Sequence, residues 1–377
     1  MAGLYLHIPF CKQRCVYCDF YSTLREAECP VYIEALCDEM RLRSSYLKGE
    51  SIRTVYLGGG TPSLLQKEHL VRLSETWSDC FKLSPDAEIT LEANPDDLSR
   101  EYLQILHNLS FNRISIGIQS FKDETLRILN RRHSVQQALR AVELCREAGF
   151  GNLSLDLIYG LPGEDLEQWK ENVEQAVALR PEHLSAYLLT YEEGTRLYTL
   201  RAEGKVDEMP EEESFECYRF LVERLKKAGY VHYEISNFAL PGYYSRHNSS
   251  YWKGAPYLGC GPSAHSYDGD SRQWNTSNLT RYMQGIRNKE PFYEKEELDL
   301  YTRYNEYIVT RLRTMWGIPL KELESLFGKK FSDYMFANAN SWIKSGKLIF
   351  REGVLCLTEQ GVFVSDAIMS DLLFVED

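Results

Sequence analysis

The chain has 377 residues, of which 44% are apolar, so it can bury a large core in more than one domain. Its net charge of −12 at pH 7 argues against a broad nucleic-acid surface, because such surfaces need clustered Lys and Arg. No apolar run is long enough to span a bilayer, and the N-terminal sequence MAGLYLHIPFCKQRC lacks the features of a signal peptide. We therefore expect a cytoplasmic protein whose ten cysteines are not paired in disulfides.

Short β-type runs alternate with amphipathic helical patterns through the first half of the chain. The predicted strands are 4–8, 54–57, 88–92, 113–118, 153–158 and 183–188. Helical patterns lie between them at about 30–47, 66–82, 99–109, 134–148 and 165–179. Such alternation predicts right-handed crossovers and a parallel sheet covered by helices. Since six units are too few for an eight-stranded barrel, we expect an α/β fold with an open, partial (β/α)6 barrel.

The pattern changes after about residue 205. A helix at about 210–228 leads into the run 230–238 and then into a stretch rich in Gly, Ser, Asn and Tyr that ends near 279. From about 297 the chain predicts three helices, a β-hairpin formed by 347–350 and 354–357, and a last segment at 358–373. This order is typical of a winged-helix-like domain. We therefore predict a partial barrel at 1–205, a helix with an irregular and β extension at 206–290, and a winged-helix-like domain at 291–377.

Three cysteines lie within eight residues directly after the first predicted strand: Cys11, Cys15 and Cys18. Three thiolates on one loop can bind three corners of a cubane iron–sulfur cluster. The fourth iron then stays open and can chelate a small ligand through nitrogen and oxygen. A zinc site with His7 as fourth ligand is the alternative. Zinc sites usually use two-cysteine knuckles in pairs, so this spacing favours the cluster.

Polar or glycine-rich positions follow the other predicted strands. Gly58-Gly59-Gly60-Thr61-Pro62 ends the second strand, and its glycines let a ligand approach backbone amides and carbonyls. Glu92 ends the third predicted strand, Gln119 ends the fourth, and Asp156 lies within the fifth. A polar residue of this kind is more often a satisfied core residue than a ligand contact. Several at one rim predict a site whose acidic groups suit ribose hydroxyls and a cationic amino group.

Together these motifs resemble the radical S-adenosylmethionine (SAM) superfamily, in the branch around oxygen-independent coproporphyrinogen III oxidase, over nearly the whole chain. The resemblance implies that the three cysteines ligate a [4Fe–4S] cluster and that Tyr5 lies beside SAM. It also implies the remaining cofactor-site residues, which are Gly59, Gly60 and Thr61 at the methionine end, and Glu92, Gln119, Arg131 and Asp156. In this superfamily the reduced cluster splits the sulfonium of SAM and releases a 5′-deoxyadenosyl radical.

Two departures from the oxidase narrow the resemblance. The oxidase has a fourth cysteine two residues after the third, whereas Cys18 is followed here by Asp19 and Phe20. The oxidase also has a longer N-terminal arm. In lacking both features, the chain resembles the HemW-type proteins, which are heme chaperones often mislabelled as oxidases. The sequence HNSSYW at 247–252 agrees, because it matches the HNxxYW motif of that group.

The resemblance therefore implies a protein that binds heme and delivers it to a client heme protein, such as a cytochrome or respiratory enzyme. An electron donor would be a second partner, and peripheral membrane contact would come through the clients. His247 is a candidate axial ligand, and Tyr251 and Trp252 can cover an apolar macrocycle. His265 and Cys260 remain alternative ligands, and the usual CxxCH signal for covalent heme attachment is absent. The alternative functions are the oxidase reaction itself and radical chemistry on another substrate.

Overall fold

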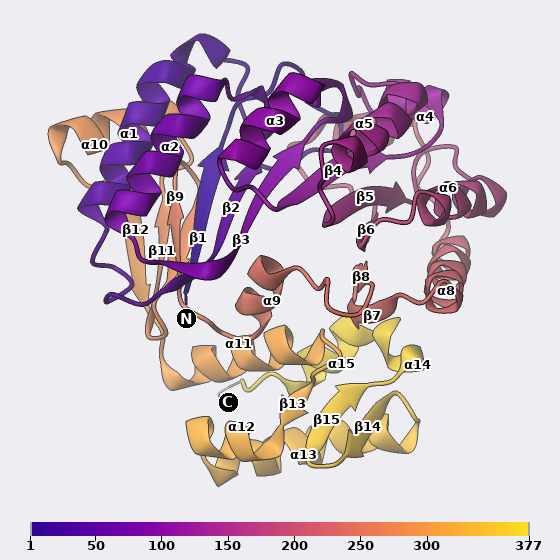
Figure 1. The fold of residues 1–377 in the computed structure, drawn as a ribbon. Helices are drawn as coiled ribbons and strands as arrows, with labels where there is room; N and C mark the ends of the chain where they lie inside the picture. The colour runs from indigo at the N-terminus through magenta and orange to yellow at the C-terminus, as the bar shows by residue number, and fades with distance from the viewer. Residues whose placement is uncertain (1, 376–377) are drawn as a thin grey trace.

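The structure, a computed structural model, describes residues 2–375 and is built on one twelve-stranded sheet (Figure 1). Six central strands run parallel and pair in chain order. They are β1 (Ala2–Ile8), β2 (Ile52–Gly59), β3 (Leu83–Ala93), β4 (Arg113–Gln119), β5 (Leu153–Tyr159) and β6 (His183–Leu188). The predicted strands and the α/β partial-barrel class are confirmed.

Helices connect these strands and cover the outside of the sheet (Figure 1). Five were predicted: α1 (Cys29–Leu42), α2 (Lys67–Cys80), α3 (Arg100–Asn108), α5 (Val135–Glu147) and α6 (Leu166–Ala178). Three of them begin at a side chain that accepts a backbone N–H of the first turn, namely Ser99, Ser134 and Asp165. The short helices α4 (Asp123–Ile128) and α7 (Arg196–Ala202) were not predicted, because they are too short to show a clear period.

Both edges of the sheet are extended by the segment after α8 (Glu211–Lys227). At one edge β8 (Asn237–Ala239) pairs antiparallel with β6, and β7 (Val231–Glu234) pairs with β8. At the other edge β9 (Tyr257–Cys260) runs parallel to β1, followed by antiparallel β10 (His265–Tyr267), β11 (Ser271–Asn275) and β12 (Tyr293–Glu297). These added strands belong to the same sheet as the six barrel strands. The domain boundary expected at residue 205 therefore remains a prediction.

A buried carboxylate holds the added strands to the barrel. Glu39, in α1, is fully buried and accepts hydrogen bonds from the backbone N–H of Gly261 at 2.7 Å and from the Tyr282 hydroxyl, in α10 (Leu279–Asn288), at 2.6 Å. Its other oxygen accepts from Asn275 at 2.8 Å and Arg43 at 3.0 Å. Four donors thus compensate the desolvation of one charge.

The C-terminal part of the chain forms a separate small unit with its own hydrophobic cluster. It contains α11 (Leu300–Leu312), α12 (Leu320–Phe327), α13 (Lys329–Lys344), α14 (Glu359–Val362) and α15 (Ser365–Leu372). Its three-stranded sheet has the order β13 (Ile318–Pro319), β15 (Val354–Leu357), β14 (Leu348–Arg351). The predicted hairpin and helix order are therefore observed. The unit packs below the large sheet, next to α9 (Arg246–Trp252) (Figure 1).

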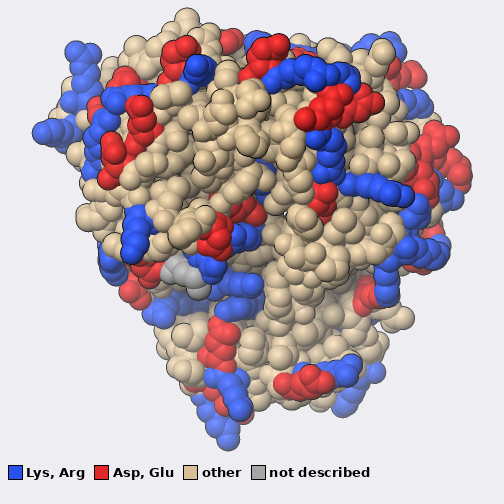
Figure 2. Space-filling view, in the orientation of Figure 1, with Lys and Arg blue, Asp and Glu red and all other residues tan. Residues whose placement is uncertain are grey.

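On the face of the molecule drawn in Figure 2, acidic and basic side chains are intermixed and form no continuous basic surface. Within residues 2–375, no helix combines the length and the apolar composition that a bilayer crossing requires.

We expect Glu39→Gln to lower the free energy of unfolding by about 2–4 kcal/mol, because an amide cannot accept from four buried donors. Urea denaturation curves measure the change. The matched control is Glu34→Gln in the same helix, where Glu34 is paired with Arg72 but 56% exposed. That variant should lose less than about 1 kcal/mol. Equal losses in the two variants would show that the Glu39 contacts contribute nothing specific.

Candidate functional site

A cavity of about 470 Å³ opens where the parallel strands end. Ten of the residues singled out from the sequence line it: Cys11, Cys15, Cys18, Gly59, Gly60, Thr61, Glu92, Gln119, Arg131 and Asp156. Parallel strands have all their carboxyl ends at one rim, so residues far apart in the sequence meet there. The expectation of one shared rim is met for these ten.

The three cysteine thiols lie on the wall of this cavity and none is in a disulfide. The Thr61 hydroxyl donates to Cys11 Sγ at 3.4 Å, and Arg131 Nη1 donates to Cys15 Sγ at 3.4 Å. Donors directed at sulfur stabilise the thiolate, which is the form that ligates iron. The donor set therefore fits a [4Fe–4S] cluster.

The zinc alternative fits less well. Both ring nitrogens of His7 are already hydrogen-bonded, Nδ1 to the Tyr5 hydroxyl at 3.0 Å and Nε2 to the carbonyl of Tyr21 at 2.9 Å. Across the described part of the chain, no three His, Cys, Asp or Glu side chains converge to hold a single ion. A cubane takes one thiolate per iron, so its cysteine ligands do not have to converge on one point.

The glycine turn after β2 lies directly against the end of β1. Gly60 donates its N–H to the carbonyl of Ile8 at 2.8 Å, and a Cβ on Gly60 would lie 2.8 Å from the carbonyl oxygen of Phe10. Gly59 has φ +111°, in a region that side chains other than glycine rarely adopt. Because the backbone of the turn lies so close to the backbone of residues 8–10, Thr61 reaches the cysteine loop.

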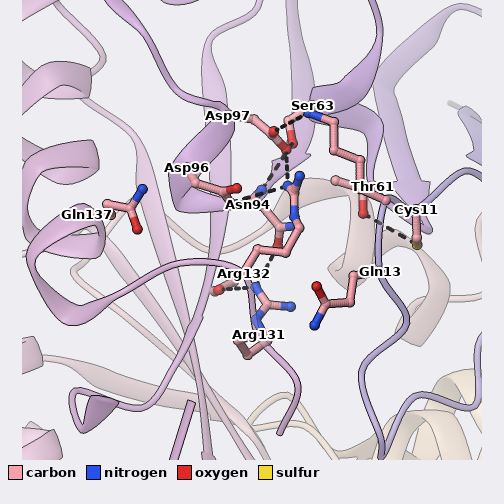
Figure 3. Close-up of polar contacts among 12 residues, drawn as sticks. Cys11, Gln13, Thr61, Ser63, Asn94, Asp96, Asp97, Arg131, Arg132 and Gln137 are labelled. Carbon is pink, nitrogen blue, oxygen red and sulfur yellow. Dashed lines mark hydrogen bonds and ion pairs between the residues drawn. The ribbon is translucent and has the colours of Figure 1, made fainter. Parts of the chain in front are cut away.

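A polar network holds the neighbouring turns together (Figure 3). Arg131 Nη2 donates to Asn94 Oδ1 at 2.6 Å, and the Asn94 N–H donates to Ser63 Oγ at 3.1 Å. Ser63 and Arg132 both donate to Asp97, at 2.8 and 2.9 Å. These contacts join the 3-10 turns Pro62–Leu64 and Pro95–Asp97 to the loop after α4. Sequence reasoning missed Ser63, Asp97 and Arg132, although a proline within three residues of each strand end marks both turns.

Glu92 is the acidic group nearest the glycine turn. Its carboxylate accepts from the Tyr56 hydroxyl at 2.7 Å and from the Gly59 N–H at 3.1 Å. Burial raises the pKa of the Glu92 carboxyl to about 7, with Asp156 adding to the rise and the Tyr56 hydrogen bond opposing it. A carboxyl with this pKa changes its protonation near neutral pH, and a bound cation favours its charged form.

Asp156 and Gln119 form the wall on the side of β4 and β5. Ser115 donates its hydroxyl to Asp156 at 3.1 Å, and burial raises the pKa of Asp156. Gln119 ends β4 with φ +69°, a strained conformation for a residue other than glycine. Ser115 and Tyr187 also line the cavity but were not predicted, because neither stands at a strand end with a distinctive motif.

Four other candidates lie outside the cavity lining. Tyr5 is half-buried beside Tyr56, with ring centroids 6.2 Å apart. His247 is 1% exposed, Cys260 is fully buried, and His265 is exposed next to Trp274. None of the four lines the cavity, but Tyr5 lies close enough to Glu92 to interact with it electrostatically, and His247 stacks on Tyr56, which donates to Glu92.

Comparisons with known proteins agree with this geometry. A model of the radical SAM superfamily matches residues 5–176, and a model of the HemN C-terminal domain matches residues 298–364. The heme chaperone HemW of Bacillus subtilis is 34% identical over 377 residues, which cover 99% of each chain. The heme chaperone HemW of Escherichia coli is 36% identical over 330 residues, 86% of each chain. This chain belongs to the HemW family.

The fold agrees with a solved structure. The structure of coproporphyrinogen III oxidase (HemN) from Escherichia coli, a radical SAM enzyme, matches with a TM-score of 0.85 at 24% identity. The match covers 99% of this chain and 90% of that one, and at this identity it establishes the radical SAM fold. As a HemW-family member with a radical SAM domain, the chain takes a [4Fe–4S] cluster and SAM as cofactors.

We expect Gly60→Ala to lower cluster loading by more than half, because the new Cβ would push the cysteine loop away from Thr61. Iron content and the cluster's visible absorption after anaerobic reconstitution measure the loading. Gly151→Ala is the matched control, since a Cβ there meets nothing within 4 Å. Normal loading of Gly60→Ala would mean that the loop tolerates a wider separation.

The raised pKa of Glu92, about 7, gives two linked expectations. SAM affinity should increase as the pH rises through 7, because the carboxylate attracts the sulfonium cation, and Glu92→Gln should remove this dependence. The free energy of unfolding should change in the opposite direction, and decrease as the pH rises. The folded protein holds a proton that the unfolded chain releases, so this group destabilises the fold increasingly as pH rises from about 4.5 to above 7.

Calorimetric titration of SAM and thermal unfolding, each over that pH range, measure the two effects of Glu92. In the absence of SAM, Glu92→Gln should gain stability relative to the wild-type protein at pH 8 but not at pH 4.5. A wild-type SAM affinity that stays flat across pH 7 would contradict the assignment.

Proposed function

We propose that this protein binds heme and delivers it to a client heme protein, on a scaffold that carries a SAM-coordinated [4Fe–4S] cluster. The observation that carries the proposal is the match to proteins named heme chaperone HemW over 99% of the chain. The cysteine loop supports it, because Cys18 is followed by Asp19 and Phe20 and lacks the Cys-x-Cys ending of the oxidase.

In this proposal Cys11, Cys15 and Cys18 hold the cluster, while Thr61 and Arg131 stabilise two of the thiolates by hydrogen bonds. Gly59, Gly60, Glu92, Gln119 and Asp156 form the SAM site together with Thr61 and Arg131. The two carboxylates supply the negative charge that a sulfonium cation requires. When bound, the cluster and SAM supply one-electron chemistry.

Exposed apolar side chains at the cavity are suited to a flat apolar ligand. Phe20 is 68% exposed, and Leu188 and Tyr187 are 45% and 42% exposed. Exposed apolar groups beside a cavity typically mark a binding surface. Heme placed against them would lie close to the cluster loop.

The axial ligand is proposed from accessibility. His265 is exposed, whereas Cys260 is fully buried and His247 uses both ring nitrogens in hydrogen bonds. Iron could reach His247 only if those two bonds broke, so exposure favours His265 as the ligand. Because His265 does not line the cavity, ligation there and packing on the exposed apolar side chains of the cavity are alternative heme positions.

The proposal includes two partners, a client heme protein and an electron donor, and places the protein in the cytoplasm. None of the ten cysteines is in a disulfide, which is the state expected in a reducing compartment. Oxidase activity is not part of the proposal, because the likeness to HemN at 24% identity concerns the fold.

The test is a titration of hemin into the anaerobically reconstituted protein, with and without SAM, followed by transfer to an apo-heme protein. We expect a saturable Soret band, transfer to the acceptor, and a weaker band in His265→Ala. With SAM and a reductant, coproporphyrinogen III should remain unconverted. Conversion at enzymatic rates, or the absence of saturable heme binding, would contradict the proposed function.

A further inference from the structure

Helix α9 carries the HNxxYW motif and closes the barrel at the end where the strands begin, opposite the cavity. His247 lies against Thr54, near the start of β2, and a Cβ on Gly3 of β1 would be 3.4 Å from its ring. Hydrogen bonds join its Nδ1 to the Thr54 hydroxyl at 2.8 Å and its Nε2 to the Tyr251 hydroxyl at 2.6 Å. The imidazole is thus fixed in position and in rotation.

The fixed imidazole packs on a tyrosine that contacts the SAM site. The rings of His247 and Tyr56 are stacked, with centroids 4.9 Å apart and planes 22° from parallel. The Tyr56 hydroxyl in turn donates to Glu92 Oε1 at 2.7 Å. One side chain therefore separates the motif's histidine from the cavity's carboxylate.

The helix is anchored on both sides, so it provides a rigid support. At its start, Glu88 of β3 accepts the backbone N–H of Arg246 at 3.0 Å and of His247 at 3.1 Å. At its end, the Arg313 guanidinium lies 4.3 Å from the ring centroid of Trp252. Arg313 is itself held by Glu234 at 2.7 Å.

We propose that His247 is a positioning residue for the SAM site: it fixes Tyr56 and, through Tyr56, the carboxylate of Glu92. The HNxxYW motif then acts by supporting the SAM site and not by binding heme iron. This inference rests on the proposed role of Glu92 in binding SAM, and it is independent of whether the protein binds heme.

Several titratable groups surround Glu92, and the readout must separate them from His247. Tyr56 donates to it, Asp156 adds negative charge, Arg113 adds positive charge, and Tyr5 and Tyr251 lie close enough to interact with it electrostatically. Burial lowers the pKa of His247 to about 3, so the imidazole is neutral throughout the useful range. A change in the pH profile on altering His247 therefore reflects the placement of Glu92 and not the loss of a charge.

The experiment measures the Kd of SAM by calorimetry on the reconstituted holoprotein between about pH 6 and 8.5, with a parallel hemin titration. We expect His247→Leu to weaken SAM about tenfold and to shift the pH midpoint, with hemin binding unchanged. His247→Gln keeps polar contacts to Thr54 and Tyr251 and should recover part of the affinity. His107→Gln, an exposed histidine on α3, is the control and should match the wild-type protein.

If His247→Leu fails to fold or to load the cluster, the same SAM titration on Tyr251→Phe tests the proposal, because this variant removes one hydroxyl and leaves the packing intact. We expect that variant to weaken SAM and to shift its pH midpoint in the same direction. Weaker hemin binding with an unchanged SAM Kd and pH profile, in either variant, would overturn the inference. If the wild-type protein binds no hemin, the proposed function fails, while the SAM data still decide the role of His247.

Discussion

The contact between the glycine turn and the end of β1 determines the rest of the site. Gly60 donates to the carbonyl of Ile8, and there is no room for a Cβ between the two backbones. That contact places the Thr61 hydroxyl on Cys11 and leaves the N–H of Gly59 facing Glu92. The cysteine loop and the glycine turn therefore meet through one close backbone contact. Three further strands, β3, β4 and β5, add Glu92, Gln119 and Asp156 to the same cavity.

The electrostatics of the cavity follow from where its charges are buried. Glu92 and Asp156 lie on its wall, and burial raises the pKa of both carboxyls. Arg113, below them in the barrel, is 1% exposed, and its Nε and Nη1 have no hydrogen-bond partner among the described residues. Acidic groups held partly uncompensated favour a cationic ligand, because binding then supplies the missing charge. Burying them therefore costs folding stability, and that cost is offset when a cationic ligand binds.

Much of the fold and most of the cavity could be predicted from the sequence. Strand–helix alternation identified β1 to β6. Strand ends identified Glu92 and Gln119, because a parallel sheet gathers those ends at one rim, and a polar residue within a buried strand identified Asp156. The β9 to β12 strands gave little periodic signal, since each is only three to five residues long. The Ser63–Asp97–Arg132 network depends on how three turns fold back on each other, which no local pattern encodes.

The HNxxYW motif identifies the family, but the motif alone does not tell what its side chains do. A histidine beside a tyrosine and a tryptophan suggests a heme pocket when only the sequence is considered. In the structure, His247 faces the barrel interior while Trp252 faces Arg313 of the C-terminal part. The segment 237–297, which contains α9 and extends both edges of the sheet, also supplies Gly261 and Asn275 as donors to the buried Glu39. The segment 237–297 thus contacts the barrel at both sheet edges and at the end opposite the cavity, and its helix α9 lies between Arg313 of the C-terminal unit and Tyr56, which donates to Glu92.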